Sequence, residues 1–388
     1  MLPFDNMSAD PDQDFFAAGI SEDIITELSK FRSFFVIARN SSFAQKGQAL
    51  SIREVGKNLG VRYVVEGSVR RAGNRVRVNA QLIDAIEDQH IWAERYDREL
   101  EDIFAVQDEV TAAIVTAIEP QLSHVERQRA RRKPTENLDA WESHQRGLWH
   151  VFSYTRIGDA IEDFERSIAL DSGFSSPHAG LAYSMAVRVL QGKSPDRTAD
   201  IDRGIREAEI ALELDQNDPF AHFSRGRIAI TNADHDHAVD AFQQALKLNP
   251  NYALAHFGLA HALWHAGRPD EAVPHHDDAI RLSPQDPILW AIQASKAIAL
   301  AMLEKYDLAI ALSREAQRTG ANQVWSYLGE ASGLALSGRV SEAADVVERI
   351  KSFEPAYCVE FLGKSLPMNE SAAKERFIHG LTLAGQTP

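Results

Sequence analysis

The sequence predicts a protein of two parts: an α/β N-terminal domain with a mixed sheet, followed by an all-α superhelix of stacked helix pairs. Up to about Leu122, short β-branched or aromatic runs alternate with stretches of helical period, which is typical of a mixed α/β unit. After Pro134, apolar residues recur almost only at helical spacing. The chain has 388 residues, whereas a single hydrophobic core usually stops growing at roughly 250 residues. We therefore expect at least two structural units.

The first part opens with a strand, a helix and a second strand. Residues 2–4 have the pattern of the end of a strand, and the apolar run 34–39 predicts a buried strand. Between them, residues 15–31 predict a helix, because several aliphatic side chains share one helical face. These side chains are Ile20, Ile24, Ile25 and Leu28.

A second helix is marked at both of its ends. Ser51 and Glu54 form a capping box, in which each side chain satisfies a backbone amide in the first turn. Gly60 is placed to end the helix in a left-handed conformation. The sequence therefore predicts a short helix from Ser51 to about Leu59.

A hairpin and a long helix complete the first part. The runs 62–71 and 75–84 alternate apolar and polar residues on either side of Gly73–Asn74, which predicts an antiparallel hairpin with a tight turn. Residues 90–96 predict a further strand. Apolar residues at helical spacing over 103–118 then predict an amphipathic helix.

A basic stretch separates the two parts. Arginine and lysine cluster at 127–133, immediately before Pro134. We expect a helical linker at 123–139, after an α/β domain at 1–122. These cations could contact nucleic acid or anionic lipid. The net charge of −15 instead favours a solvated helix end, whose cations lie at the negative end of the helix dipole.

The second part repeats itself with a period of about 34 residues. The clearest copy, 219–252, has small residues, Gly226 and Ala238, where paired helices approach closely, and Phe242 where successive repeats meet. The next copy, 253–286, follows in the same register. Two adjacent copies in register indicate a true internal repeat.

This part resembles the tetratricopeptide family on six motif copies, two clear and four degenerate. The resemblance implies stacked helix pairs in a right-handed superhelix, whose first helices line a concave peptide-binding groove. An insertion at 191–200 predicts a long loop, and 358–388 predicts a capping segment and tail. The copies fill 140–357 and lie at 140–174, 175–218, 219–252, 253–286, 287–321 and 322–357.

The first part resembles the TolB-like domain of bacterial signalling proteins. The resemblance rests on LPFDNMS, FFAAGISEDIITELSKF, FVIARNSSF, LGVRYVVEGSVRRAGNRVRVNAQLIDA and HIWAERYDREL, which together span nearly all of residues 1–122. It implies a fold and a regulatory context, and it assigns no catalytic residue. In that family the domain is typically followed by tetratricopeptide repeats. It is often preceded by a class III adenylate or guanylate cyclase domain or by a winged-helix DNA-binding domain.

Neither of those output domains is recognisable in this sequence. Class III cyclases need two metal-binding aspartates on a ferredoxin-like sheet, and no segment offers that arrangement. The sequence begins inside the first strand of the family pattern. We therefore expect either the carboxy-terminal part of a longer cyclase-type protein or a start site that shortens this strand.

Composition excludes several classes of protein. Lys and Arg number 41 against 56 Asp and Glu, and the resulting negative charge repels a polyphosphate backbone, so we expect no nucleic-acid partner. The single cysteine, Cys358, cannot form an intramolecular disulfide. The sequence has neither a signal peptide nor an apolar run of about 18 residues. We expect a cytoplasmic protein without a membrane segment.

Five histidines within one repeat raise the question of a metal site. His261 and His265 are four residues apart and share a helical face, as metal ligands often do. The general base of an H-E-x-x-H motif is missing, since Ala262 follows His261, and spacing alone provides no third ligand. We therefore expect no metal and no cofactor. The five histidines are His256, His261, His265, His275 and His276.

The candidate partner-binding residues lie on the first helices of the two clearest copies, at places that the tetratricopeptide resemblance assigns to the concave surface. They combine aromatic faces with cationic side chains, which suits an acidic or apolar peptide. For Trp264 the alternative is packing against the next repeat. The candidates are Phe220, Phe223, Arg227, Phe257, His261 and Trp264.

These patterns predict a non-catalytic regulatory and scaffold protein of bacterial signalling that binds a protein or peptide through its repeats. The alternative is the carboxy-terminal regulatory fragment of an adenylate or guanylate cyclase or of a winged-helix transcription regulator. A weaker alternative is a metal-dependent hydrolase that uses the histidine cluster. The sequence specifies neither the partner, nor the signal, nor the oligomeric state.

Overall fold

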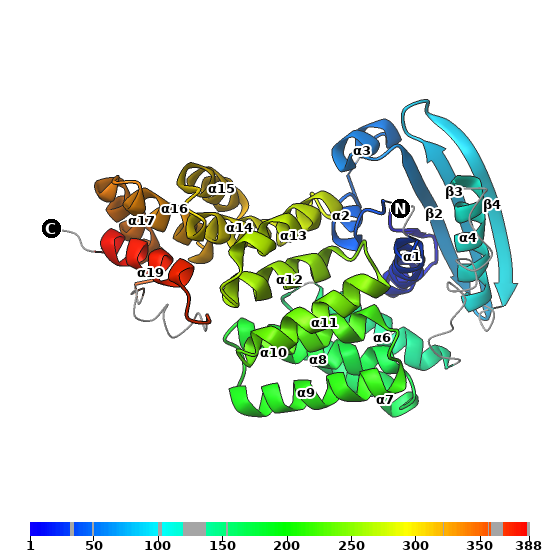
Figure 1. Cartoon of the computed structure of the whole chain (residues 1–388). Coiled ribbons are helices and arrows are strands. Elements are labelled where there is room, and N and C mark those ends of the chain that lie inside the picture. The colour runs from blue at the N-terminus through cyan, green and yellow to red at the C-terminus, as the bar shows by residue number, and fades with distance from the viewer. Residues whose placement is uncertain are drawn as a thin grey trace. The chain divides into compact units, whose positions relative to one another are not determined.

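A computed structural model of the chain describes residues 1–388 except 32–34, 49, 100–102, 119–136, 153, 321, 356, 358–367 and 386–388. The predictions for the basic stretch 127–133 and for Cys358 lie outside the described residues. The chain divides into two compact units (Figure 1), one of residues 1–228 with 244–252 and one of residues 229–243 with 253–388. Within the described part, no helix is long and apolar enough to cross a membrane.

A four-stranded sheet forms the centre of the N-terminal region. Its strands are β1 (Asp5–Asn6), β2 (Tyr63–Ala72), β3 (Arg75–Asp84) and β4 (Gln89–Glu99). They lie in the order β1-β2-β3-β4, with β1 parallel to β2 and the other neighbours antiparallel. The predicted hairpin is confirmed: Ala72 pairs with Arg75, and Gly73 has the positive φ of 62° that the turn requires.

Two helices cover one face of this sheet, α1 (Asp14–Ser29) and α4 (Ile103–Ile118). Side chains that alternate along β2 and β3, such as Val69 and Val78, point toward these helices and join their aliphatic residues in one core. A third helix, α3 (Ile52–Leu59), contributes Val55 and Leu59 to a smaller cluster with Val64. The two helical predictions for 15–31 and 103–118 are confirmed.

The start of α3 has the predicted capping box. The hydroxyl of Ser51 accepts a hydrogen bond from the backbone N–H of Glu54 at 3.3 Å, and the Glu54 carboxylate accepts one from the backbone N–H of Ser51 at 2.8 Å. Gly60 ends the helix with a φ of 66°. Local sequence signals therefore define both ends of this helix.

The predicted strand at 34–39 is wrong for its described residues. Residues 35–38 form no strand, and a short helix, α2 (Arg39–Phe43), begins at the end of the run. Val36 packs in the core under α1, whereas Ile37 packs in the cluster of α3. Val36 and Ile37 are thus buried by side chains on two sides, whereas Phe35 is exposed, and residues 35–38 form no strand. The first strand is also displaced, from the predicted 2–4 to Asp5–Asn6.

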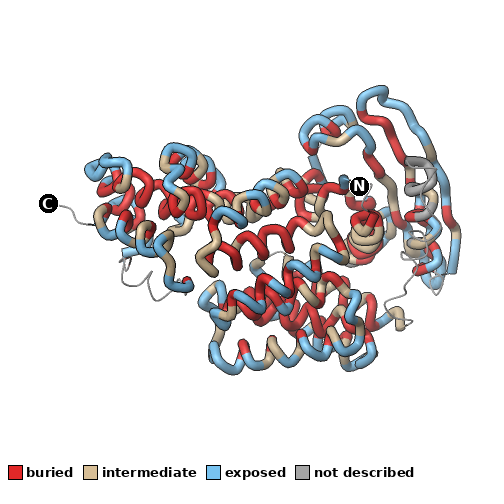
Figure 2. Tube along the Cα trace, viewed as in Figure 1, coloured by how far each residue is buried: buried red, intermediate tan, exposed pale blue. Residues whose placement is uncertain are grey.

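Helix pairs follow the sheet region. They are α6 (Leu138–Val151) with α7 (Ile157–Leu170), α8 (Ser175–Leu190) with α9 (Arg197–Leu214), α10 (Pro219–Thr231) with α11 (His235–Leu248), α12 (Ala253–His265) with α13 (Pro269–Leu282), α14 (Leu289–Met302) with α15 (Tyr306–Thr319), and α16 (Trp325–Leu336) with α17 (Val340–Phe353). A last helix, α19 (Ala372–Gly385), packs on α16 and α17. The first helices are more continuously buried than the second ones (Figure 2), as α12 and α13 illustrate. The predicted fold class is confirmed.

Glycines allow bulky aromatic side chains to fill the spaces between successive helices. A methyl group added to Gly258 would lie 2.4 Å from the ring of Phe242, and one added to Gly180 would lie 2.4 Å from the ring of Phe164. Both phenylalanines are fully buried. Each ring therefore occupies the space that a side chain on the next first helix would need.

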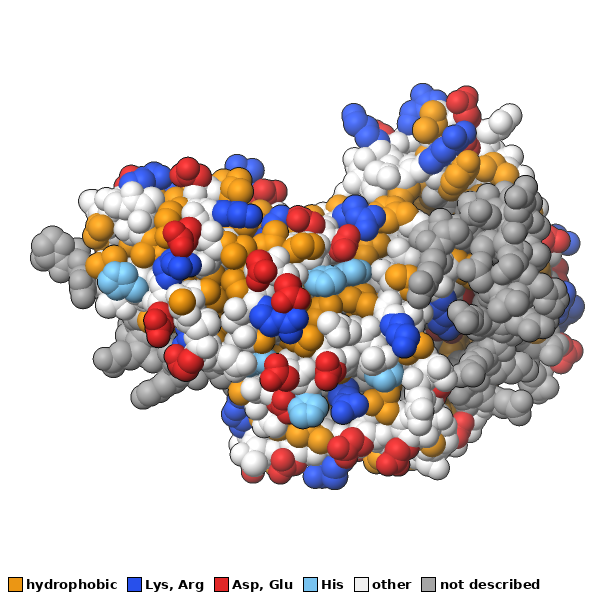
Figure 3. Space-filling model, in the orientation of Figure 1, with side chains coloured by type: hydrophobic (Ala, Val, Ile, Leu, Met, Phe, Trp, Pro, Cys, Tyr) orange, Lys and Arg blue, Asp and Glu red, His pale blue; other side chains and the backbone are white. Residues whose placement is uncertain are grey.

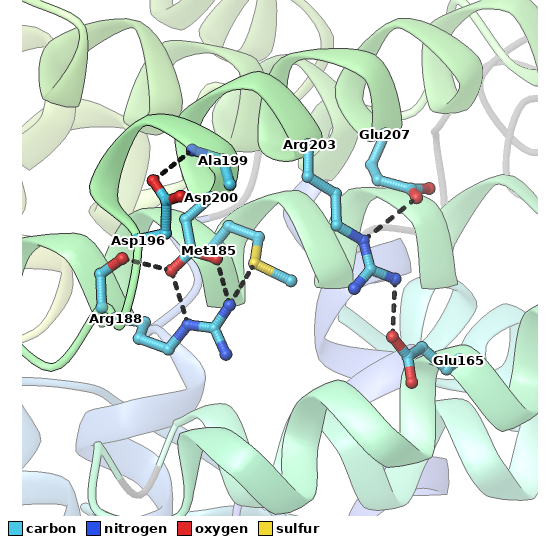
Figure 4. A network of polar contacts seen from close by, with 9 residues as sticks. Glu165, Met185, Arg188, Asp196, Ala199, Asp200, Arg203 and Glu207 are labelled. Atoms are coloured by element: carbon cyan, nitrogen blue, oxygen red, sulfur yellow. Dashed lines mark hydrogen bonds and ion pairs between the residues drawn. The ribbon is translucent and has the colours of Figure 1, made fainter.

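The predicted loop at 191–200 is shorter in the structure, because α9 begins at Arg197. The Asp196 side chain accepts a hydrogen bond from the backbone N–H of Ala199 at 3.0 Å and so caps the helix. Arg188 at the end of α8 forms an ion pair with Asp200 (Figure 4), with one nitrogen–oxygen distance of 2.8 Å. These contacts tie the end of α8 to the start of α9.

Candidate functional site

The six predicted partner-binding residues lie in two different units. Phe220, Phe223 and Arg227 are on α10 in the first unit. The other three are on α12 in the second unit, namely Phe257, His261 and Trp264. Each set therefore has surroundings of its own.

The residues of α10 belong to a row of aromatic rings. Phe220 stacks on Phe223 with a centroid distance of 6.1 Å and an interplanar angle of 17°. The rings of Tyr183, on α8, and Tyr252 lie 5.1 Å and 5.2 Å from that of Phe223. Phe223 is only 1% exposed, so this side chain belongs to the core rather than to an open surface. Phe220 and Arg227 are half-buried.

The N-terminal region reaches the ends of this aromatic row. The guanidinium of Arg39, on α2, lies 4.9 Å from the ring of Phe152, which is itself 6.0 Å from Tyr183. Arg39 is held by an ion pair with Glu22 at 2.7 Å. Burial is the main cause that raises the pKa of the Tyr252 phenol well above its ordinary value. The row is therefore a largely apolar contact between the sheet region and the first helix pairs, with Tyr183 and Phe223 buried at its centre.

Trp141 of α6 joins the first helix pair to the core of the sheet region. Its fully buried ring meets Phe16 edge-on at 5.5 Å and Phe104 at 5.7 Å. The indole N–H donates a 3.0 Å hydrogen bond to Asp23 Oδ2. Trp141 thus completes the hydrophobic core under α1 and α4.

Polar contacts reinforce the same junction. Gln145, one turn after Trp141, donates a 3.2 Å hydrogen bond to the other carboxylate oxygen of Asp23. Arg71 of β2 forms an ion pair with Glu142 of α6. Sequence patterns gave no sign of this junction, because Trp141 and Asp23 are 118 residues apart and periodicity reports only neighbours within an element.

Trp264 lies in the interior of the second unit. Its side chain is fully buried, and its indole N–H donates a 2.8 Å hydrogen bond to the hydroxyl of Ser295 on α14. The structure therefore contradicts an exposed concave position for Trp264 and agrees with the alternative of packing against the next repeat. The physical reason is size: this ring fills the space between successive helix pairs.

The other two residues of α12 are closer to the surface. Phe257 is 8% exposed and packs with Ala279 and Ile292. His261 is half-buried and stacks on Phe257 with a centroid distance of 5.9 Å. His265 meets His261 edge-on at 4.6 Å. Of the six candidates, Phe220, Arg227 and His261 therefore keep partly exposed side chains.

A cavity of about 660 Å³ lies against the sheet, beside the chain between α2 and α3. The side chains on its sheet wall are hydrogen bonded to one another: Gln81 donates to Glu66, and Asn79 donates to Ser68 at 3.0 Å. Such mutual pairing stabilises the strands. It does not identify a cofactor.

Two family models match separate parts of the chain. Residues 223–287 match a tetratricopeptide repeat model. Residues 1–113 match the model of the second domain of HilA/YgeH-like transcriptional regulators. The predicted tetratricopeptide repeats are confirmed. The TolB-like identity of the first part is not confirmed and remains a prediction.

One curated relative is "Putative adenylate cyclase 3" of Rhizobium meliloti (strain 1021), which is 44% identical over 229 residues. The alignment covers 58% of this chain and 38% of that protein. The chain thus spans little more than a third of the relative's length.

Solved structures of repeat proteins also resemble the chain. A crystal structure of YrrB, a TPR protein with an unusual peptide-binding site, is 17% identical with a TM-score of 0.38 and covers 52% of this chain and 98% of that one. The APC/C hetero-tetramer Cut9–Hcn1 is 16% identical with a TM-score of 0.48 and covers 72% of this chain and 52% of that one. The family match and the helix pairs together lead to one conclusion: the chain contains tetratricopeptide repeats, the architecture of protein-interaction scaffolds.

Proposed function

We propose that the chain is a non-catalytic regulatory scaffold, in which the sheet region and the first helix pair act as one body and the repeats bind a protein partner. The observation that carries the proposal is the position of Trp141, a repeat residue that lies in the core of the sheet region. A change in the sheet region would be transmitted to α6 through this side chain, because close-packed interiors transmit strain.

Within the repeats, we assign partner contact to Phe220, Arg227 and His261. Their partial exposure supports this role. Phe223, Phe257 and Trp264 would then act indirectly, by holding α10 and α12 in place. Arginine and aromatic side chains are the types that most often dominate interface energies.

The system that this scaffold serves is proposed from the relatives. The identity to a protein named as an adenylate cyclase supports a regulatory role in cyclase-type signalling. The match of residues 1–113 to a domain of transcriptional regulators favours the alternative, in which the chain belongs to a transcription regulator. In both cases the chain itself supplies recognition rather than chemistry.

Affinity capture with the full chain tests the scaffold proposal. Wild type, Arg227→Ala and His261→Ala would be used as bait in lysate of the source organism, and bound proteins would be identified by mass spectrometry. Arg225→Ala is the matched control, because Arg225 lies on the same helix with an exposed side chain. We expect Arg227→Ala to lose partners that Arg225→Ala keeps, at an unchanged melting temperature. Identical partner sets in all variants would contradict the assignment.

A further inference from the structure

Three potential metal ligands meet on one helix pair of the second unit. His256 is on α12 and is 8% exposed. His275 and Asp278 are on α13, three residues apart, so they share one helical face. Sequence spacing pointed to His261 and His265, whose rings do lie together; the fold also brings together His256 and His275, which the spacing did not indicate.

The donor atoms of these side chains converge. The Nδ1 atoms of His256 and His275 are 3.1 Å apart, and Asp278 Oδ2 lies 3.9 Å from Nδ1 of His256. All three donor atoms lie within 4.8 Å of one another. Two nitrogens bound to one tetrahedral zinc ion, each at about 2.0–2.1 Å, are separated by about 3.3 Å. The two imidazoles therefore already have nearly the separation of zinc ligands.

The carboxylate of Asp278 is oriented toward the imidazoles. Its Oδ1 accepts a 2.9 Å hydrogen bond from Arg281, one turn further along α13. This contact leaves Oδ2 as the oxygen that faces His256. Contacts that fix the direction of a ligand in this way are a common feature of metal sites.

The cluster is accessible from solvent. His275 and Asp278 are both half-buried, so their donor atoms are not enclosed in the core. Figure 3 shows histidine side chains at the surface in the region of α12 and α13.

We propose that His256, His275 and Asp278 form a zinc-binding site that joins α12 to α13, with water completing the coordination. Among the residues that the structure describes, these three form the group of histidine, cysteine or acidic side chains whose donor atoms lie close enough together, within 4.8 Å, to bind one ion. Imidazole nitrogen and carboxylate oxygen are both ligands that Zn²⁺ uses in proteins. The site is independent of the proposed partner binding.

Equilibrium dialysis of the full chain against zinc chloride tests the proposal. The protein would first be stripped with a chelator, and bound zinc would be measured by atomic absorption. We expect about one zinc ion per wild-type chain and a rise in melting temperature, because an ion that binds only the folded state stabilises it. His275→Ala and Asp278→Asn should each weaken zinc binding at least tenfold.

The control variant is His237→Ala, since His237 is an exposed histidine on α11 outside this cluster. It should bind zinc as wild type does. Melting curves without zinc show whether each variant is folded. If His275→Ala does not fold, Asp278→Asn still tests the proposal, because asparagine has nearly the same shape as aspartate. Wild type without stoichiometric zinc, or a folded Asp278→Asn or His275→Ala that binds zinc as tightly as wild type, would overturn the proposal.

Discussion

The indole of Trp264 and the imidazole of His276 are joined through one hydroxyl group, that of Ser295. Trp264 Nε1 donates to Ser295 Oγ at 2.8 Å, and Ser295 Oγ lies 2.9 Å from His276 Nε2. His276 Nδ1 lies 3.0 Å from the carbonyl oxygen of Ala272 and donates to it. Nε2 is then the acceptor for the Ser295 hydroxyl, so each group in the chain has one role. This network links α12, α13 and α14 in the second unit.

Replacing Trp264 should destabilise the second unit strongly. Trp264→Ala removes a fully buried ring and leaves a cavity between helix pairs, which typically costs about 3–5 kcal/mol. Ser295→Ala keeps the ring but removes both the acceptor of the indole N–H and the donor to His276 Nε2, so we expect a smaller loss of about 1–3 kcal/mol. Urea denaturation followed by circular dichroism measures both. A loss for Trp264→Ala no larger than that for Ser295→Ala would be inconsistent with a core role for the ring.

The buried state of His276 makes stability depend on pH. Burial lowers its pKa to about 3, from an ordinary value of 6.5. Between these values the unfolded chain binds a proton that the folded chain excludes, so this contribution is complete above the ordinary pKa and is lost as the pH falls below it. The slope is up to about 1.4 kcal/mol per pH unit for one such histidine.

Comparison with His276→Gln isolates this effect. Unfolding free energies would be measured in urea at several pH values between 7.5 and 5. We expect a smaller loss of stability on acidification for His276→Gln than for wild type. His144 in the first unit is also buried with a pKa lowered to about 3, and it remains in both proteins. Parallel pH curves would mean that the pKa of His276 is the same in the folded and the unfolded chain.

The features predicted correctly from sequence depend on nearby residues. The capping box and the hairpin turn are made by residues within a few positions of one another, so Ser51 and Gly73 could be interpreted without the fold. The prediction of a strand at 34–39 was wrong because apolar side chains indicate burial but not hydrogen bonding to another strand. Val36 and Ile37 are buried by side chains from different helices. Long-range packing decided that segment.

The candidate site shows the same limit. Helical spacing placed Trp264 on a first helix. Which side of that helix faces the next helix pair depends on packing against α14, where Ser295 accepts the hydrogen bond of the indole. The role of Trp141 in the core could not be predicted for a related reason, since its partners Phe16 and Phe104 lie far away in sequence. Likewise Asp278 is a candidate ligand only because α12 and α13 pack together, which brings its carboxylate near His256.

Glycine at 258 should be essential for the spacing of the repeats. Gly→Ala in a helix normally stabilises by roughly 0.5–1 kcal/mol. At Gly258 the added methyl would lie 2.4 Å from the buried ring of Phe242, so we expect a net loss of about 1–3 kcal/mol. Gly158→Ala is the matched control, because Gly158 is exposed on α7 with no other atom near the new methyl. Equal melting temperatures for the two variants would contradict the proposed packing.

The junction at Trp141 should make the sheet and α6 open together. Trp141 lies in the core between Phe16 and Phe104, so unfolding of α6 would expose these two rings and open that core. Amides of β3 and α6 should therefore report similar opening free energies in native-state hydrogen exchange. Trp141→Ala should destabilise this body by about 3–5 kcal/mol and separate the two sets of amides. Trp149→Ala is the control on the same helix, since Trp149 is 36% exposed, and it should leave the exchange pattern of wild type unchanged. If β3 and α6 already exchange independently in wild type, the sheet region does not act on the repeats through Trp141, and the regulatory role proposed for this junction fails with it.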